Sequence, residues 1–207
     1  PEHGATWGMG RVIALERPDT FGGLVDLPAE PGDADLAALL KQLGAPGPED
    51  QLALRGGRCF ARRLVHASAE PKAPTWSPRG TVLITGGTGA LGAHLARWLV
   101  ERGAEHLVLT SRRGEDAPGA KELQASLQEQ GARVTLAACD VAERDALQAL
   151  LTTLDADEAP LSAVIHTAGV VGMTPLEDLT PEDLANALAA KVSGAFNLHH
   201  LLGEREL

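Results

Sequence analysis

Residues 81–92 constrain the fold most, because a glycine-rich turn follows directly on an apolar strand and leads into a helix. The turn has the spacing G-x-G-x-x-G, with glycines at Gly87, Gly89 and Gly92. We expect Gly87 to permit a tight turn, Gly89 to let the backbone approach phosphates and Gly92 to let the helix pack on the strand. The helix start offers free N–H groups to an anion. The turn therefore predicts a dinucleotide pyrophosphate site, although a plain strand-turn-helix gives the same spacing.

Strands and helices alternate regularly after residue 75, which predicts a parallel sheet covered on both faces. Strands are expected at 82–85, 106–110, 134–138 and 163–166. Helices are expected at 91–102, 119–130, 143–151 and 181–202. The last helix has a strong start signal, with Thr180 as N-cap, Pro181 at the first helical position and Asp183 in the first turn. The predicted fold class is α/β, a Rossmann-type doubly wound parallel sheet.

Proline and small residues crowd at 67–74, which predicts a boundary between two parts, 1–74 and 75–207. In the first part we expect a strand at 22–27, a helix at 35–43 and a hairpin around Gly56-Gly57. The hairpin strands are predicted at 51–55 and 58–65. These elements are too few for an independent domain, so the first part resembles the end of one.

Composition and net charge argue against several kinds of binding partner. The net charge of −10 and the dispersed basic residues argue against a nucleic-acid surface. Cys59 and Cys139 lie in strand-like apolar runs, which favours buried thiols in a reducing compartment over a disulfide or a metal site. Nothing resembles a signal peptide, and no apolar run approaches the ~20 residues of a membrane span. We therefore expect a cytoplasmic protein without a nucleic-acid, membrane or metal partner.

The loop after the second predicted strand bears on cofactor choice, because it meets the adenosine ribose in such folds. An acidic residue there would bind a 2′-hydroxyl and repel a 2′-phosphate, but the chain has Ser111-Arg112-Arg113. Arginine binds phosphate through charge-assisted hydrogen bonds of roughly 1.5–3 kcal/mol each. The loop thus predicts that NADPH binds more tightly than NADH, by about one to two decades in affinity. An ordinary basic surface turn could have the same sequence.

Two further segments follow the third and fourth predicted strands. Asp140-Val141 offers a carboxylate that could accept a hydrogen bond from the adenine amino group or cap the next helix, and both roles stay open. At 166–169 small residues could let the backbone lie along the nicotinamide half. The pattern favours His166 as a structural, hydrogen-bonded histidine over a catalytic one.

Lys191 falls on an apolar stripe of the last predicted helix, at helical spacing from Leu184, Leu188, Ala195 and Leu198. A buried ammonium group is costly unless it has a partner. One interpretation is a cation that stabilises a developing anion or lowers the pKa of a proton donor. The alternative is a lysine that snorkels at the margin of the stripe.

Several segments together resemble the ketoreductase domains of modular polyketide synthases, within the short-chain dehydrogenase/reductase superfamily. They are residues 85–92, 111–114, 139–141, 166–170 and 190–195. Residues 7–16 and 22–28 resemble the later half of the structural subdomain that precedes the catalytic half in these domains. The resemblance implies that the sheet of 75–207 is preceded by part of a truncated Rossmann-like subdomain.

The resemblance implies a function for the catalytic half. It would transfer hydride from NADPH to the β-keto group of a β-ketoacyl thioester on an acyl carrier protein, beside other domains of the same polyketide synthase. Lys191 matches the family's catalytic lysine, whose charge favours the tyrosinate that forms. The residues expected to bind the cofactor are Gly86, Gly87, Thr88, Gly89, Leu91, Ser111, Arg112, Asp140, Val141, Ala168 and Gly169.

The sequence also departs from the family. It has no tyrosine and ends at Leu207, before the family's serine, tyrosine and asparagine, so we expect a piece incomplete at both ends and inactive alone. Two alternatives stay open: a non-reducing ketoreductase-like domain with a structural or epimerising role, and an extended short-chain dehydrogenase acting on a nucleotide sugar.

The loop after the fourth predicted strand bears on the stereochemistry of the product. It has Val171-Gly172-Met173 where family members that form the D-configured alcohol have Leu-Asp-Asp. The loop thus predicts an A-type domain that forms the L-configured alcohol.

Overall fold

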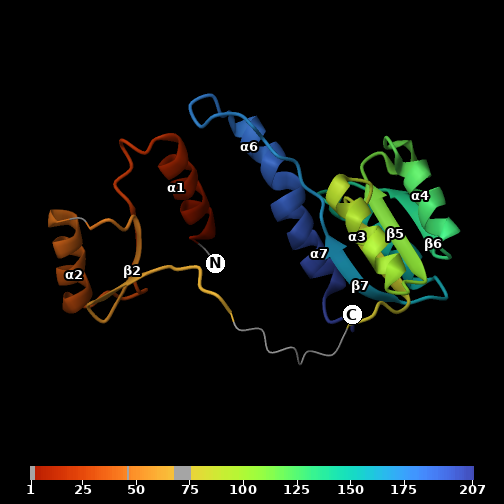
Figure 1. The fold of residues 1–207 in the computed structure, drawn as a ribbon, viewed down its shortest axis with the longest axis horizontal. Coiled ribbons are helices and arrows are strands. Elements are labelled where there is room, and N and C mark those ends of the chain that lie inside the picture. Colours follow the sequence, from red (N-terminus) through yellow and green to blue (C-terminus); the bar gives the residue numbers. More distant parts are fainter. Residues whose placement is uncertain (1–2, 46, 68–75) are drawn as a thin grey trace. The chain divides into compact units, whose positions relative to one another are not determined.

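The computed structural model describes residues 3–45, 47–67 and 76–207. The chain forms two compact units (Figure 1). Unit one comprises Pro1–Lys72 with Pro175–Asp178, and unit two comprises Ala73–Thr174 with Leu179–Leu207. The predicted boundary at residue 74 lies outside the described residues.

Unit one holds a three-stranded sheet of order β1-β2-β3, formed by β1 (Leu24–Asp26), β2 (Gln51–Arg55) and β3 (Arg58–Ala61). The predicted hairpin joins β2 to an antiparallel β3, which is shorter than expected. Its turn residues Gly56 and Gly57 have φ of +57° and +72°, as a two-residue hairpin of this hand requires. Cys59 is exposed, because it lies on the edge strand β3, so the prediction of a buried thiol there is wrong.

Two helices complete unit one. The predicted helix at 35–43 is present as α2 (Asp33–Gly44), whereas α1 (Gly4–Glu16) has no counterpart among the predicted elements. Glycines weaken the helix signal of α1. One of them lies against β1, since a Cβ on Gly10 would lie 2.7 Å from Leu24 Cδ1.

Unit two holds a parallel four-stranded sheet of order β6-β5-β4-β7, and all four predicted strands are confirmed. Their bounds are β4 (Thr81–Thr85), β5 (His106–Ser111), β6 (Arg133–Ala138) and β7 (Leu161–His166). The first three predicted helices of this part are also confirmed, as α3 (Ala90–Glu101), α4 (Ala120–Glu129) and α5 (Arg144–Asp155), with a 3-10 turn η1 (Gly114–Asp116) after β5.

The two faces of this sheet carry separate cores, because successive residues of a strand point to opposite faces. One cluster joins Val82, Ile84, Leu107 and Leu109 of the sheet to apolar residues of α3 and α4. The other joins Leu83 and Val108 to α5 and to Leu198. Every residue of β4 is therefore buried, and the sheet is doubly wound as predicted.

The last predicted helix consists of three continuous parts, α6 (Pro181–Leu188), a π-helical turn η2 (Ala189–Gly194) and α7 (Ala195–Leu202). Its start is as predicted, since Thr180 Oγ1 accepts a hydrogen bond from the Asp183 N–H at 3.1 Å. A π turn closes i→i+5 hydrogen bonds and has more residues per turn than an α-helix. Positions at α-helical spacing on its two sides thus no longer share one face.

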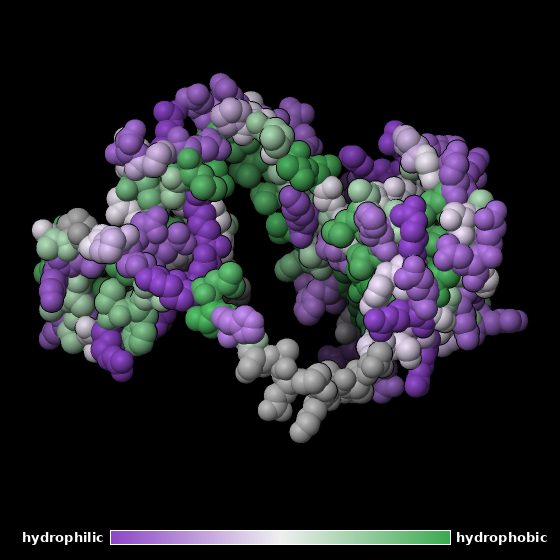
Figure 2. Space-filling view, viewed as in Figure 1, coloured by the Kyte–Doolittle hydropathy of each residue, from purple (hydrophilic) through white to green (hydrophobic). Residues whose placement is uncertain are grey.

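The predicted apolar stripe on this helical run is mostly exposed. Leu184 and Leu188 are 38% and 44% exposed, whereas Leu198, beyond the π turn, is buried in the core. Hydrophobic residues show on the surface in the region of α6 (Figure 2). None of the described helices combines the length and the apolar character that a membrane-spanning helix requires.

Candidate functional site

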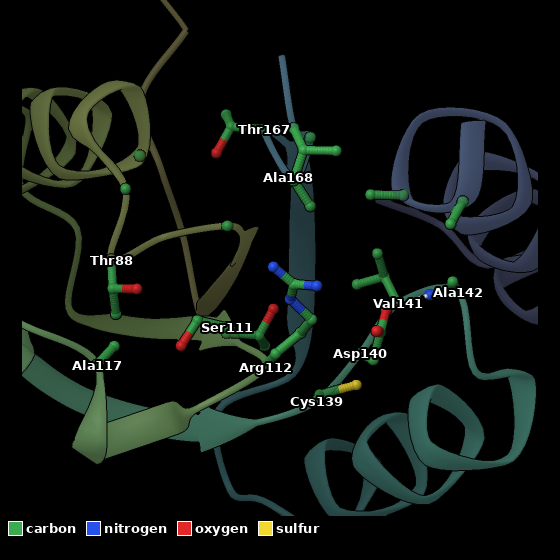
Figure 3. Close-up of a pocket in the computed structure, with 18 of the residues that line it drawn as sticks. Thr88, Ser111, Arg112, Ala117, Cys139, Asp140, Val141, Ala142, Thr167 and Ala168 are labelled. Carbon is green, nitrogen blue, oxygen red and sulfur yellow. Dashed lines mark hydrogen bonds between the residues drawn. The ribbon is translucent and has the colours of Figure 1, made fainter. Parts of the chain in front are cut away.

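A cleft of about 1230 Å³ opens in unit two, where the carboxyl ends of all four strands meet (Figure 3). It is the place where ligands bind in open parallel α/β sheets. Ten of the predicted site residues line it: Gly86, Thr88, Gly89, Leu91, Ser111, Arg112, Asp140, Val141, Ala168 and Gly169. Gly87 and Lys191 are not among the lining residues.

The glycine turn forms one wall, and its backbone is tightly packed. Gly86, rather than Gly87, has the positive φ of the turn, +67°, and a Cβ on it would lie 2.7 Å from the Ala168 Cα. Gly87 is instead required by space, since a Cβ there would lie 2.8 Å from the Leu109 Cβ. Gly92 lets α3 approach the turn itself, because its Cβ would lie 2.5 Å from the Gly86 carbonyl oxygen. The glycine pattern thus brings β4, β5 and β7 within backbone contact.

The start of α3 faces the same cleft, through Gly89, Ala90, Leu91 and Gly92. Gly89 is the N-cap residue and has no side chain to accept from the first N–H groups of the helix. Its carbonyl accepts from Ala93 N at 2.8 Å. The N–H groups before Ala93 lack an intrahelical partner, and with the helix dipole they suit an anion.

The loop after β5 brings a cation to the cleft. Arg112 is exposed, and in the close-up it lies between Ser111 and the pair Asp140 and Val141 (Figure 3). It forms no ion pair within the described part of the chain. The chain turns away after it at Gly114, which has φ of +54° and leaves no room for a Cβ beside Ala138 N. Arg112 itself stays among the residues that line the cleft.

Thr110, at the end of β5, also lines the cleft, and sequence reasoning missed it. Its hydroxyl oxygen is buried and has no hydrogen-bond partner among the described residues. A buried hydroxyl without a partner costs free energy. Since Thr110 reads as an ordinary strand residue, only the structure reveals this unpaired group.

Asp140 closes a local turn after β6. Its Oδ1 accepts a hydrogen bond from Ala142 N at 3.0 Å, and Glu143 is the N-cap residue of α5. The interpretation of Asp140 as the helix cap is therefore wrong, because the chain needs three more residues before α5 begins. Its position on the cleft leaves the adenine role as a prediction.

Asn197 of α7 fixes the same loop, and sequence reasoning missed it. Its Nδ2 donates to the carbonyl oxygens of Val141 at 3.0 Å and Ala142 at 2.9 Å. The partners lie more than fifty residues apart in sequence, so no local pattern signals the contact.

Cys139, in the same loop region, is buried as predicted. Burial, followed by the nearby Asp140 charge, raises the pKa of its thiol. The thiol is thus protonated and unreactive at neutral pH.

His166 ends β7 and is hydrogen-bonded through both ring nitrogens, as predicted. Nδ1 lies 2.6 Å from Thr85 Oγ1, and Nε2 lies 3.0 Å from the Ala190 carbonyl oxygen. Lys191 follows Ala190 in the π turn and is exposed. The expectation of a lysine within a buried stripe is wrong, because Leu184 and Leu188 of that stripe are themselves exposed and the π turn then breaks the α-helical spacing.

The stem of Lys191 nevertheless runs beside the cleft wall. A Cβ on Gly169 would lie 3.1 Å from Lys191 Cε and 3.4 Å from its Cγ. Gly169 thus provides the space in which the lysine stem lies. Within the described residues, no group of three or more His, Cys, Asp or Glu side chains could hold a metal ion.

A family model described as "KR domain" matches residues 80–207, which is more than half of the chain. The chain belongs to the KR domain family. A second model, described as the Rossmann fold domain of the polyketide synthase extender module SpnB, matches residues 1–64. The predicted family and the Rossmann-type fold class are therefore confirmed.

Curated and solved KR-domain relatives give the same assignment. The chain is 54% identical over 204 residues to the pikromycin polyketide synthase component PikAIII of Streptomyces venezuelae, covering 98% of this chain and 13% of that protein. A solved A-type ketoreductase from a modular polyketide synthase matches with a TM-score of 0.86 and 52% identity, covering 99% of this chain and 43% of that one. A solved A1-type ketoreductase matches equally well, with a TM-score of 0.86 and 52% identity. The chain thus spans less than half of these relatives.

KR domains use a nicotinamide cofactor, and the residues of this cleft fit one. The glycine turn and the start of α3 form a cradle with no room for a Cβ at Gly86, Gly87 or Gly92, which suits the close approach of a pyrophosphate. The guanidinium of Arg112 lies where a polar group of a ligand could bind.

Proposed function

We propose that this KR domain takes part in NADPH-dependent reduction of the β-keto group of a β-ketoacyl thioester. The single observation that carries the proposal is the cleft itself, in which the glycine cradle and Arg112 lie at neighbouring strand ends. Arginine binds a 2′-phosphate through charge-assisted hydrogen bonds, which favours NADPH over NADH.

In this proposal each wall of the cleft holds one part of the cofactor. Gly86, Gly87, Thr88, Gly89 and Leu91 hold the pyrophosphate, and Ser111 and Arg112 hold the 2′-phosphate. Asp140 and Val141 contact the adenine, and Ala168 and Gly169 lie along the nicotinamide. The bound cofactor supplies the hydride.

Lys191 is the catalytic residue that this segment contributes. Its ammonium group, carried on a stem that lies beside Gly169, stabilises the negative charge that develops on the proton donor as the alcohol forms. The effect is electrostatic and needs no proton transfer from the lysine itself. In the family the donor is a tyrosine, which the residues of this chain do not include.

We further propose that residues 1–74 are the later part of a structural subdomain with a linker, and that 75–207 are the NADPH-binding part of the catalytic subdomain. The match of residues 1–64 to a polyketide synthase Rossmann model supports the first assignment. The substrate would be carried on an acyl carrier protein, and other domains of the same synthase would be partners. The multidomain synthases among the relatives support that context.

The loop after β7 supports an A-type domain with an L-configured product. Val171 and Met173 are 81% and 87% exposed, and with Gly172 they leave no carboxylate there to guide the carrier arm. Similarity to A-type and A1-type ketoreductases, at 52% identity, supports the same type.

The test is reduction by the complete ketoreductase domain that contains this segment. A β-ketoacyl thioester is supplied with NADPH or with NADH, and the alcohol is resolved by chiral chromatography. We expect an L-configured alcohol and faster turnover with NADPH. A D-configured product would contradict the A-type, and epimerisation without reduction would favour a non-reducing domain.

A further inference from the structure

The ring of His166 connects the core of the sheet to the π turn. A carbonyl oxygen only accepts, so His166 Nε2 carries a proton and donates it to Ala190 at 3.0 Å. In the neutral ring, Nδ1 then accepts from the hydroxyl of Thr85 at 2.6 Å. Thr85 is buried in β4, so one side of the ring is anchored in the rigid core.

The other side of the ring holds the peptide group that carries Lys191. The carbonyl of Ala190 and the N–H of Lys191 belong to one planar peptide unit. Fixing that carbonyl therefore fixes the direction in which the main chain enters Lys191. The contact lies inside the π-helical turn, an irregular geometry that is rare in proteins and frequent at functional sites.

The end of the π turn is packed against the same ring. A Cβ on Gly194 would lie 3.4 Å from His166 Cε1 and 2.7 Å from Val141 Cγ2. The π turn is thus held near its start by a hydrogen bond and at its end by close packing. Between these points the stem of Lys191 lies against Gly169.

We propose that His166 is a positioning residue for Lys191, which acts by donating from Nε2 to the Ala190 carbonyl. The hydrogen bond at Ala190 sets where the stem of Lys191 leaves the main chain, and the contact of that stem with Gly169 guides it along the cleft wall, since Lys191 is exposed and not held by burial. This inference rests on the proposed function, in which Lys191 stabilises charge in the chemical step.

Two substitutions separate the two hydrogen bonds of the ring. The amide of glutamine reaches the region of Nε2 and can still donate to Ala190, whereas the shorter amide of asparagine replaces only the Nδ1 side. In the complete ketoreductase domain, we expect His166→Asn to lower kcat by about 10- to 100-fold with little change in the Kd of NADPH. His166→Gln should retain most of the turnover. Equal losses in both variants would contradict the inference.

A double-mutant cycle with Lys191→Met gives the decisive result. If His166 acts through Lys191, adding His166→Asn to Lys191→Met should slow turnover by less than about twofold. Independent losses that multiply would overturn the inference. If Lys191→Met alone left turnover unchanged, the proposed role of Lys191 would fail instead.

Folding is checked by thermal melting and NADPH binding, with His94→Asn, an exposed histidine on α3, as the matched control. If His166→Asn does not fold, the cycle is run with His166→Gln. Its smaller loss should likewise vanish in the Lys191→Met background, and a loss that persists there would overturn the inference.

Discussion

The two sides of the cleft are built differently. On the side of β4 and β5, the backbone forms the site, and glycines allow main-chain atoms to meet without side chains between them. On the side of β7 and the π turn, a side chain holds the site, through the hydrogen bonds of His166 to Thr85 and to the Ala190 carbonyl. The strands differ in the same way, because β4 is fully buried while most of β7 is only half-buried.

The difference separates binding from chemistry. A backbone cradle suits a ligand group that is the same in every dinucleotide, and it does not need to move. A side-chain framework can instead set the position of one charged group, here Lys191. Substitutions on the backbone side should therefore affect cofactor binding, and substitutions on the other side should affect turnover.

Among the substitutions that test this separation of binding from turnover, we expect Lys191→Met to have the largest effect. In the complete ketoreductase domain we expect kcat to fall by about 100-fold or more, because charge on the proton donor loses its stabilising cation. The Kd of NADPH should change little. Steady-state kinetics and cofactor titration measure both, with Lys121→Met as the control, since Lys121 is exposed and pairs with Glu115 at 3.5 Å. Near-normal turnover in a folded variant would instead favour the alternative, in which Lys191 is a snorkelling surface lysine.

Arg112→Ala tests the backbone side through a guanidinium that the loop after β5 brings to the cleft. We expect the substitution to weaken binding of NADPH by about 10- to 100-fold and to change binding of NADH very little, because only NADPH carries the 2′-phosphate. Titrating both cofactors against both proteins measures the ratio. Arg97→Ala, an exposed arginine on α3, should leave the ratio unchanged. Equal losses of affinity for the two cofactors would contradict the role of Arg112 in binding the 2′-phosphate.

The backbone side was also the part that sequence could predict. Gly87, Gly89 and Gly92 signal their turn because substitution at such positions is sterically costly, and the neighbouring Arg112 lies in the same local pattern. The other side depends on a pair far apart in sequence, His166 with Ala190. The loop of Asp140 and Val141 depends on such a pair as well, Asn197 with Val141. The π turn was missed because hydrophobic periodicity assumes a regular α-helix.

Gly92→Ala would sharpen the comparison from the backbone side. Its Cβ would lie 2.5 Å from the Gly86 carbonyl oxygen, a backbone atom that cannot move aside cheaply. Overpacking of this kind costs about 1–3 kcal/mol, so we expect a lower melting temperature and roughly tenfold weaker NADPH binding. Gly8→Ala is the matched helical control, since nothing lies within 4 Å of its added Cβ. A variant that binds NADPH normally would show that the cradle tolerates rearrangement.

Asn197→Leu should give the smallest effect, because the residue touches only the loop behind the cofactor site. The change removes two donors from the Val141 and Ala142 carbonyls while keeping the number of side-chain heavy atoms. Each such hydrogen bond contributes about 0.5–1.5 kcal/mol to stability, and only part of that should appear in cofactor binding. We expect the Kd of NADPH to rise by about threefold while kcat stays within about twofold. Gln130→Leu, which removes one exposed hydrogen bond to the Ser126 carbonyl, controls for loss of an amide at the surface. If turnover falls further than binding, the loop of Asp140 and Val141 belongs with the catalytic side of the cleft, and the division between its two sides lies elsewhere.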